Sequence, residues 1–165
     1  MEDGRRRRAL AGAILSGAAL LFVCFLIFFL SSQDAEVSGN ASGFFSKFVF
    51  RLIYGDAPGL TEEEAEALLG KVDSVVRVTA HFAEYALLGA EASLFALNIS
   101  LLSGGRTSVL PVLVAAAACL LFAVGDEIHQ IFVPGRAFEI SDILTDSAGI
   151  ITGCLPVYFL RRRLI

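Results

Sequence analysis

The chain has 165 residues, enough for one ordinary domain, but 56% of them are hydrophobic and only 18% are charged. A soluble domain of this size cannot bury so much apolar surface, whereas a lipid bilayer accepts it on the outside of the fold. The net charge of −4 comes with no basic patch interleaved with aromatic residues, which argues against a nucleic-acid partner. The sequence therefore predicts an all-α integral membrane protein with one domain over residues 1–165.

The first predicted membrane span is residues 10–30, an uncharged segment preceded by Arg5, Arg6, Arg7 and Arg8. Its length matches the roughly 20 residues needed to cross the hydrocarbon core of a bilayer. A cleaved signal peptide begins in the same way, but its apolar region is usually only about 7–15 residues long. We therefore expect a retained membrane anchor.

Residues 31–74 form a polar, mostly acidic connection in which we expect two short helices. In the first, Lys47 and Arg51 lie opposite an apolar face made of Phe44, Phe45, Phe48, Val49, Leu52 and Ile53. This pattern predicts a helix that lies in the membrane interface, and a lid packed on the bundle is an equally weighted alternative. The segment 55–59 is a helix breaker. Thr61 and Glu64 then form the capping box of a second short helix, which we expect to end near Gly70.

Three further spans are predicted at residues 75–101, 109–128 and 139–160. The two termini and the loop around Arg106 hold eight Lys or Arg in about 22 residues, while the opposite loops hold four in about 58. Because positive residues stay on the cytoplasmic side, both termini should face the cytoplasm. The prediction is thus a four-helix bundle in the bacterial cytoplasmic membrane, with its termini inside and the longest loop outside.

Ionisable residues gather on three of these spans at one predicted depth. On the second span, steps of 100° place six residues within about one third of the circumference: Arg77, His81, Glu84, Tyr85, Leu88 and Glu91. The third span ends in a polar run that contains Asp126, Glu127, His129 and Gln130. The fourth begins with Asp142 and Asp146, whose stripe continues through Gly149 and Gly153 as a small-xxx-small step for close helix packing.

The free energy needed to place charged residues in a membrane decides how to interpret these positions. A charged residue at the centre of a membrane helix costs at least about 2.5–3.5 kcal/mol, so such residues should face protein or water and mark a functional site by default. The alternative is purely structural: interhelical bonds such as one between Arg77 and Asp142 would hold the spans together. We predict a site, with Glu91 deeper than its other members.

The same residues carry a family resemblance. Three ordered blocks, Arg77-x3-His81-Phe82-x-Glu84-Tyr85-x2-Leu88, Asp126-Glu127-x2-Gln130-x-Phe132-x-Pro134-x-Arg136 and Asp142-x3-Asp146-x2-Gly149-x3-Gly153, resemble the VanZ-like family over residues 25–153. Many members have a lysine a few residues before the histidine, where this chain offers only Arg77. The resemblance implies a four-span bacterial membrane protein, and the founding member is associated with resistance to the glycopeptide teicoplanin. It carries no reaction or substrate over to this chain.

The first functional hypothesis is a polar site at the outer leaflet that binds or processes an amphiphilic or lipid-linked envelope molecule. Arg77 and Arg136 would hold a phosphate, because guanidinium forks match phosphate oxygens. Tyr85 and Gln130 complete the predicted binding residues. Acid–base chemistry would fall to His81 with Glu84, or to Glu127, with Asp142 and Asp146 in the same predicted catalytic set. A divalent metal held by these nitrogen and oxygen donors is a weaker version of the same hypothesis.

The second hypothesis is a proton- or ion-coupled transport component, or a non-enzymatic membrane partner of envelope enzymes. Glu84, Glu91 and Asp146 would form the relay. Four spans are few for an independent transporter, so this alternative requires a homo-oligomer. Glu91 separates the two hypotheses, because a site at the outer surface does not need it and a path across the membrane does.

Overall fold

The computed structural model describes residues 2–55, 59–105 and 108–164, and these form five α-helices with no strand among them. Four of the helices are long and apolar enough to cross a membrane, in agreement with the four predicted spans. The helices are α1 (Glu2–Ser31), α2 (Ala35–Tyr54), α3 (Glu62–Leu102), α4 (Val109–Gln130) and α5 (Ile140–Leu164).

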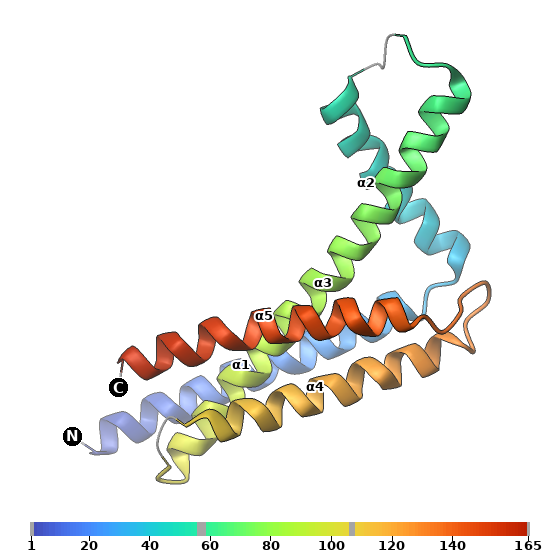
Figure 1. Cartoon of the computed structure of the whole chain (residues 1–165). Helices are drawn as coiled ribbons and strands as arrows, with labels where there is room; N and C mark the ends of the chain where they lie inside the picture. The colour runs from blue at the N-terminus through green and yellow to red at the C-terminus, as the bar shows by residue number, and fades with distance from the viewer. Residues whose placement is uncertain (1, 56–58, 106–107, 165) are drawn as a thin grey trace.

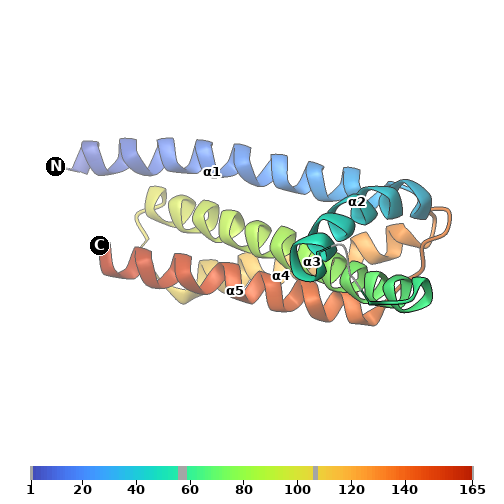
Figure 2. The same cartoon turned by 90° about the horizontal axis from the view of Figure 1, so that it is seen from above.

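The four long helices form a bundle with α3 at its centre. Figure 1 shows α1, α4, α5 and the second half of α3 running alongside one another, and the N- and C-termini lie at the same end of the bundle in both views (Figure 2). α3 packs against each of the other four helices, whereas α1 and α4 barely touch. Large apolar side chains on the outside of the bundle stay exposed, among them Leu15, Leu21, Leu121, Leu144 and Phe159. Such a surface suits a lipid environment.

Glycines set the close approach of α5 to α3. A Cβ atom on Gly149 would lie 2.5 Å from the carbonyl oxygen of Phe82, and one on Gly153 would overlap the carbonyl oxygen of Ala86. In the other direction, a Cβ atom on Gly89 would lie 2.5 Å from the carbonyl oxygen of Ile150. The predicted small-xxx-small stripe of Gly149 and Gly153 is therefore a tight backbone contact between two spans.

α2 and the first half of α3 project together from one end of the bundle, as Figure 1 shows. We name this pair the arm. Asp34 caps α2 by accepting a hydrogen bond from the backbone N–H of Val37, and α2 ends at Gly55, whose φ of 63° favours glycine. Inside the arm the buried hydroxyl of Ser46 donates to Asp73 Oδ1 at 2.7 Å, which joins α2 to α3.

The arm corrects one sequence prediction. The capping box of Thr61 and Glu64 does start a helix, but that helix does not end near Gly70 and instead runs on as α3 to Leu102. Neither a proline nor a second cap follows Gly70, and apolar residues continue at helical spacing into the span, so nothing breaks the helix there. α2 is also longer than expected, with 20 residues. Residues 56–58 of the predicted breaker and Arg106 of the basic loop lie outside the described residues.

A polar network ties the helices together at the end of the bundle that holds the termini. The guanidinium of Arg161 donates to Asn98 Oδ1 at 3.1 Å, and the amide of Asn98 donates to Ser16 Oγ at 3.4 Å. The chain of bonds crosses from α5 through α3 to α1, and Asn98 is 2% exposed. Because both bonds use the amide of a buried side chain, this network fixes the relative positions of three spans.

Candidate functional site

Two cavities flank α3 at the end of the bundle that carries the arm. The larger, about 410 Å³, lies among α1, α2, α3 and α4, and its polar lining includes Ser31, Ser38, Arg77, His81, Glu84, Asp126, Gln130 and Arg136. Ile27, Leu30, Val37, Phe45 and Val76 are among its apolar lining residues. The smaller cavity, about 250 Å³, is lined by Gly70, Asp73, Ser74, Arg77, Val78, His81, Glu139 and Asp142. Arg77 and His81 border both.

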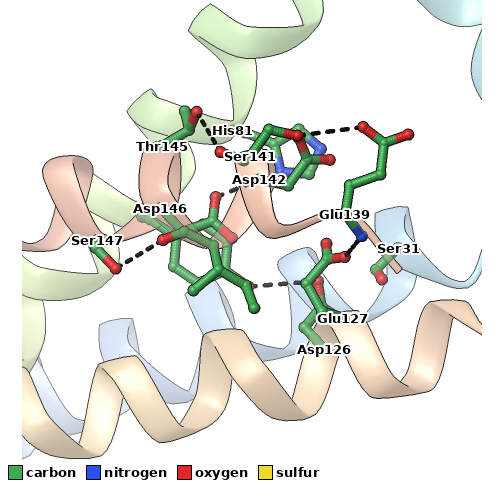
Figure 3. A network of polar contacts seen from close by, with 12 residues as sticks. Ser31, His81, Asp126, Glu127, Glu139, Ser141, Asp142, Thr145, Asp146 and Ser147 are labelled. Atoms are coloured by element: carbon green, nitrogen blue, oxygen red, sulfur yellow. Dashed lines mark hydrogen bonds and ion pairs between the residues drawn. The ribbon is translucent and has the colours of Figure 1, made fainter. Parts of the chain in front are cut away.

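His81 of α3 and Asp146 of α5 contact each other at this site (Figure 3). His81 Nδ1 lies 3.4 Å from Asp146 Oδ1, and neither atom has a hydrogen-bond partner among the described residues. The side chain of Asp146 is 1% exposed and that of His81 is 20% exposed. Because Nδ1 is buried against the carboxylate, the opposite edge of the ring, which carries Nε2, is the part of the imidazole open to the cavities.

Tyr85 and Asp126 make a second buried contact, between α3 and α4. The phenol hydroxyl of Tyr85 donates to Asp126 Oδ2 at 3.3 Å. Gln130, one turn further along α4, donates through Nε2 to the hydroxyl of Ser31 at 3.3 Å and so ties α4 to the end of α1. The predicted residues Tyr85, Asp126 and Gln130 therefore come together, and Asp126 and Gln130 reach the wall of the larger cavity.

Glu127 faces the connection between α4 and α5 rather than either cavity. It is fully buried, and its Oε2 accepts a hydrogen bond from the backbone N–H of Glu139 at 2.9 Å (Figure 3). Asp142 lines the smaller cavity together with Arg77, yet within the described residues the two form no ion pair. The acidic residues of the predicted site therefore lie in three places. Glu84 and Asp126 line the larger cavity and Asp142 lines the smaller one. Glu127 lies against the connection between α4 and α5.

Arg136 joins the loop between α4 and α5 to the arm. Its Nη2 donates to the hydroxyl of Ser38 in α2 at 2.9 Å, and the backbone N–H of Ala35 donates to the carbonyl oxygen of Pro134 nearby at 3.1 Å. Burial lowers the pKa of Arg136, and the positive charge of Arg77 lowers it further, against the opposite effect of nearby carboxylates. Two guanidinium groups thus border one cavity, together with the carboxyl groups of Glu84 and Asp126.

The sequence patterns did not connect α1 and α2 with the wall of the larger cavity. Val37 and Ser38 lie in a polar connection, and no periodicity links them to α3. Ser31 belongs to the Ser31-Ser32-Gln33 step after the first span, which also resembles the VanZ-like family in the sequence. His129 lies beside this wall, stacked on the ring of Phe28 at 4.8 Å and within 3.2 Å of the hydroxyl of Ser32. Glu91 is half-buried in α3 and lines neither cavity.

The donor set does not fit a metal ion. Among the described residues, no three His, Cys, Asp or Glu side chains come together in an arrangement that could hold one. His81 and Asp146 form a pair without a third ligand, while Asp142 and Glu127 lie on other surfaces.

The bundle defines a multi-pass membrane protein, with four helices long and apolar enough to cross a membrane. The chain belongs to the VanZ/LLP1 family, whose model matches residues 17–161. This match includes all three blocks of residues that resembled the VanZ-like family in the sequence. The comparison with curated proteins found no match, and neither did the comparison with solved structures.

Proposed function

We propose that this chain is a single-domain protein of the bacterial cytoplasmic membrane whose larger cavity binds or processes an amphiphilic or lipid-linked molecule of the cell envelope. The observation that carries the proposal is the mixed lining of that cavity. Arg77, His81 and Arg136 border the same space as Ile27 and Leu30, while further polar and apolar residues complete the wall. A cavity with both characters suits a ligand that has a charged headgroup and an apolar chain.

The arrangement of charge favours an anionic headgroup. Arg77 and Arg136 supply two guanidinium groups at one cavity, and a guanidinium fork binds phosphate oxygens with two parallel hydrogen bonds. The Nε of Arg136 is buried and has no hydrogen-bond partner among the described residues, so a donor is available.

The positive residues support an orientation in which both termini face the cytoplasm and the site lies near the outer leaflet. In that orientation the arm stands at the outer surface of the membrane. α2 would lie in the interface, because Phe44, Phe48 and Leu52 remain exposed on it. A ligand drawn from the outer leaflet would then reach the cavity beside α1 and α2.

Mass spectrometry of co-purifying lipids tests the proposal. Purified in a mild detergent, the unmodified protein should retain a specific set of anionic lipids, and Arg77→Ala together with Arg136→Ala should lose most of it. Arg162→Ala is the matched control, because this exposed arginine lies in the last turn of α5 at the opposite end of the bundle. Equal retention by the double variant and the control would contradict the proposal.

The alternative is a component for proton or ion transport, and Glu91 is the observation that favours it. This carboxyl group is half-buried within α3, between the site and the network around Asn98. An ionisable residue at that place in a span suits a relay. We favour the lipid site, because a proton relay does not account for a cavity lined by both charged and apolar side chains.

A further inference from the structure

His81 stands where two cavities of different character meet. The larger cavity has many apolar lining residues, whereas those of the smaller are polar apart from Val78 and Gly70. Arg77 and His81 are the residues that line both. A molecule with an apolar part in one cavity and a water-soluble part in the other would therefore place the bond between those parts beside these two side chains.

The pairing of His81 with Asp146 orients the imidazole for proton transfer. A carboxylate at Nδ1 favours the tautomer that is protonated there, which leaves Nε2 as a base. The carboxyl group within 4 Å of the His81 ring is that of Asp146 rather than that of Glu84, the partner that the sequence suggested. Building on the proposed function, we infer that His81 is the general base of a site that hydrolyses a phosphate ester of an amphiphile, with Asp146 as its positioning residue.

The reaction needs only the ester and water. Nε2 of His81 takes a proton from a water molecule as the water oxygen forms a bond to phosphorus. The bond from phosphorus to the leaving oxygen then breaks, and this oxygen takes the proton from His81. A phosphodiester then yields an alcohol and a phosphate monoester, and the imidazole returns to its starting state. Arg77 stabilises the negative charge that builds up on the other phosphate oxygens.

Asp126 adds an independent sign of a ligand. It lines the larger cavity, it is 7% exposed, and its Oδ1 is buried without a hydrogen-bond partner among the described residues. Its other oxygen already accepts the hydroxyl of Tyr85. A buried acceptor without a donor is costly, so a hydroxyl or amine group of the ligand is expected to complete it.

Isotope labelling tests the hydrolysis on the full chain. The protein is placed in vesicles of phosphatidylglycerol, phosphatidylethanolamine and cardiolipin in ¹⁸O-water, and the released phosphate esters are weighed by mass spectrometry. The unmodified protein should place one ¹⁸O on phosphorus in the product. His81→Gln should slow this labelling by roughly 100-fold or more, while His129→Gln, a histidine outside both cavities, should leave it unchanged. No label with the unmodified protein, or equal label with His81→Gln, overturns the inference.

The role of Asp146 has its own readout, independent of turnover. ¹⁵N NMR of histidine-labelled protein should show His81 protonated at Nδ1, and Asp146→Asn should shift protons to Nε2, with Asp146→Glu restoring the original tautomer at least in part. An unchanged tautomer in Asp146→Asn would refute the positioning role. The lipids retained by the same samples are measured as well. If the unmodified protein retains specific lipids but puts no ¹⁸O on phosphorus, the hydrolysis is refuted and the proposed lipid binding stands. If the arginine variants retain as much lipid as the unmodified protein, the proposed lipid binding is refuted.

Discussion

The carbonyl oxygen of Ala86 in α3 faces Gly153 in α5 so closely that no side-chain carbon fits between them. The contact lies within the membrane bundle, two turns along α5 from the pair of His81 and Asp146. Since the obstructing atom belongs to the backbone, no change of rotamer can make room. The separation of these two helices, and with it the distance from His81 to Asp146, therefore depends on the absence of a side chain at position 153.

Gly153→Ala should destabilise the folded protein by about 1–3 kcal/mol, because the added methyl group forces α5 away from α3. Thermal unfolding in detergent, followed by circular dichroism, measures the effect. Gly125→Ala is the matched control: Gly125 is an exposed glycine of α4, a methyl group added there would meet nothing within 4 Å, and its substitution should be neutral or slightly stabilising. Equal melting temperatures for the two variants would count against the close contact.

Glu127→Ala should cost about 1–3 kcal/mol of stability, because it leaves the backbone N–H of Glu139 without its acceptor. Glu127→Gln keeps an oxygen at that position and should recover most of the loss. Lipid retention should differ little between the two variants once both are folded, since Glu127 lines neither cavity. A glutamine variant that is stable but retains no lipid would instead place Glu127 in the binding machinery.

Arg136→Ala should loosen the start of α2, because its guanidinium donates to the hydroxyl of Ser38. Hydrogen exchange of the backbone amides over residues 35–40 should accelerate, while exchange in the second half of α3 stays as it was. Arg51→Ala removes an exposed arginine from the same helix and serves as the control. Slow exchange in both variants would show that the bond from Ala35 to Pro134 is enough to hold α2 in place.

Glu91→Gln separates the two candidate functions. A lipid site at the end of the bundle should keep its ligand, because Glu91 lines neither cavity. A proton path should lose its activity, because a glutamine cannot carry a proton as a carboxyl group does. The variant is therefore compared with the unmodified protein in two assays: retention of co-purifying lipid, and dissipation of a pH gradient across proteoliposomes. Lost proton flux with normal lipid retention would favour the transport alternative.

The sequence allowed the prediction of four spans, their approximate bounds and the polar face of α3. Length, hydropathy and the 100° rotation per helical residue can each be evaluated within one continuous segment. It also indicated the glycine stripe, since a spacing of four residues is visible in one helix. The partner of His81 could not be chosen in this way. The sequence placed Glu84 on the same face of α3 as His81, and only the crossing of α3 and α5 brings Asp146 to the imidazole.

The arm shows a second limit of the sequence patterns. A glycine at position 70 and a change from acidic to apolar residues favour the end of a helix, although neither stops the hydrogen-bond ladder by itself. The sequence allowed α2 to be a lid packed on the bundle, but it did not identify which residues of α2 would line the cavity. Val37 and Ser38 reach it through the loop contact with Pro134 and Arg136, which are about a hundred residues away in the chain.

Because α3 is one helix of 41 residues, it is about 60 Å long at 1.5 Å per residue, roughly twice the thickness of the hydrocarbon core. About half of α3 must therefore lie beyond the hydrocarbon core. The half that projects from the bundle (Figure 1) is the one that Ser46 and Asp73 join to α2, so the arm is the part of α3 that reaches the headgroup region or water.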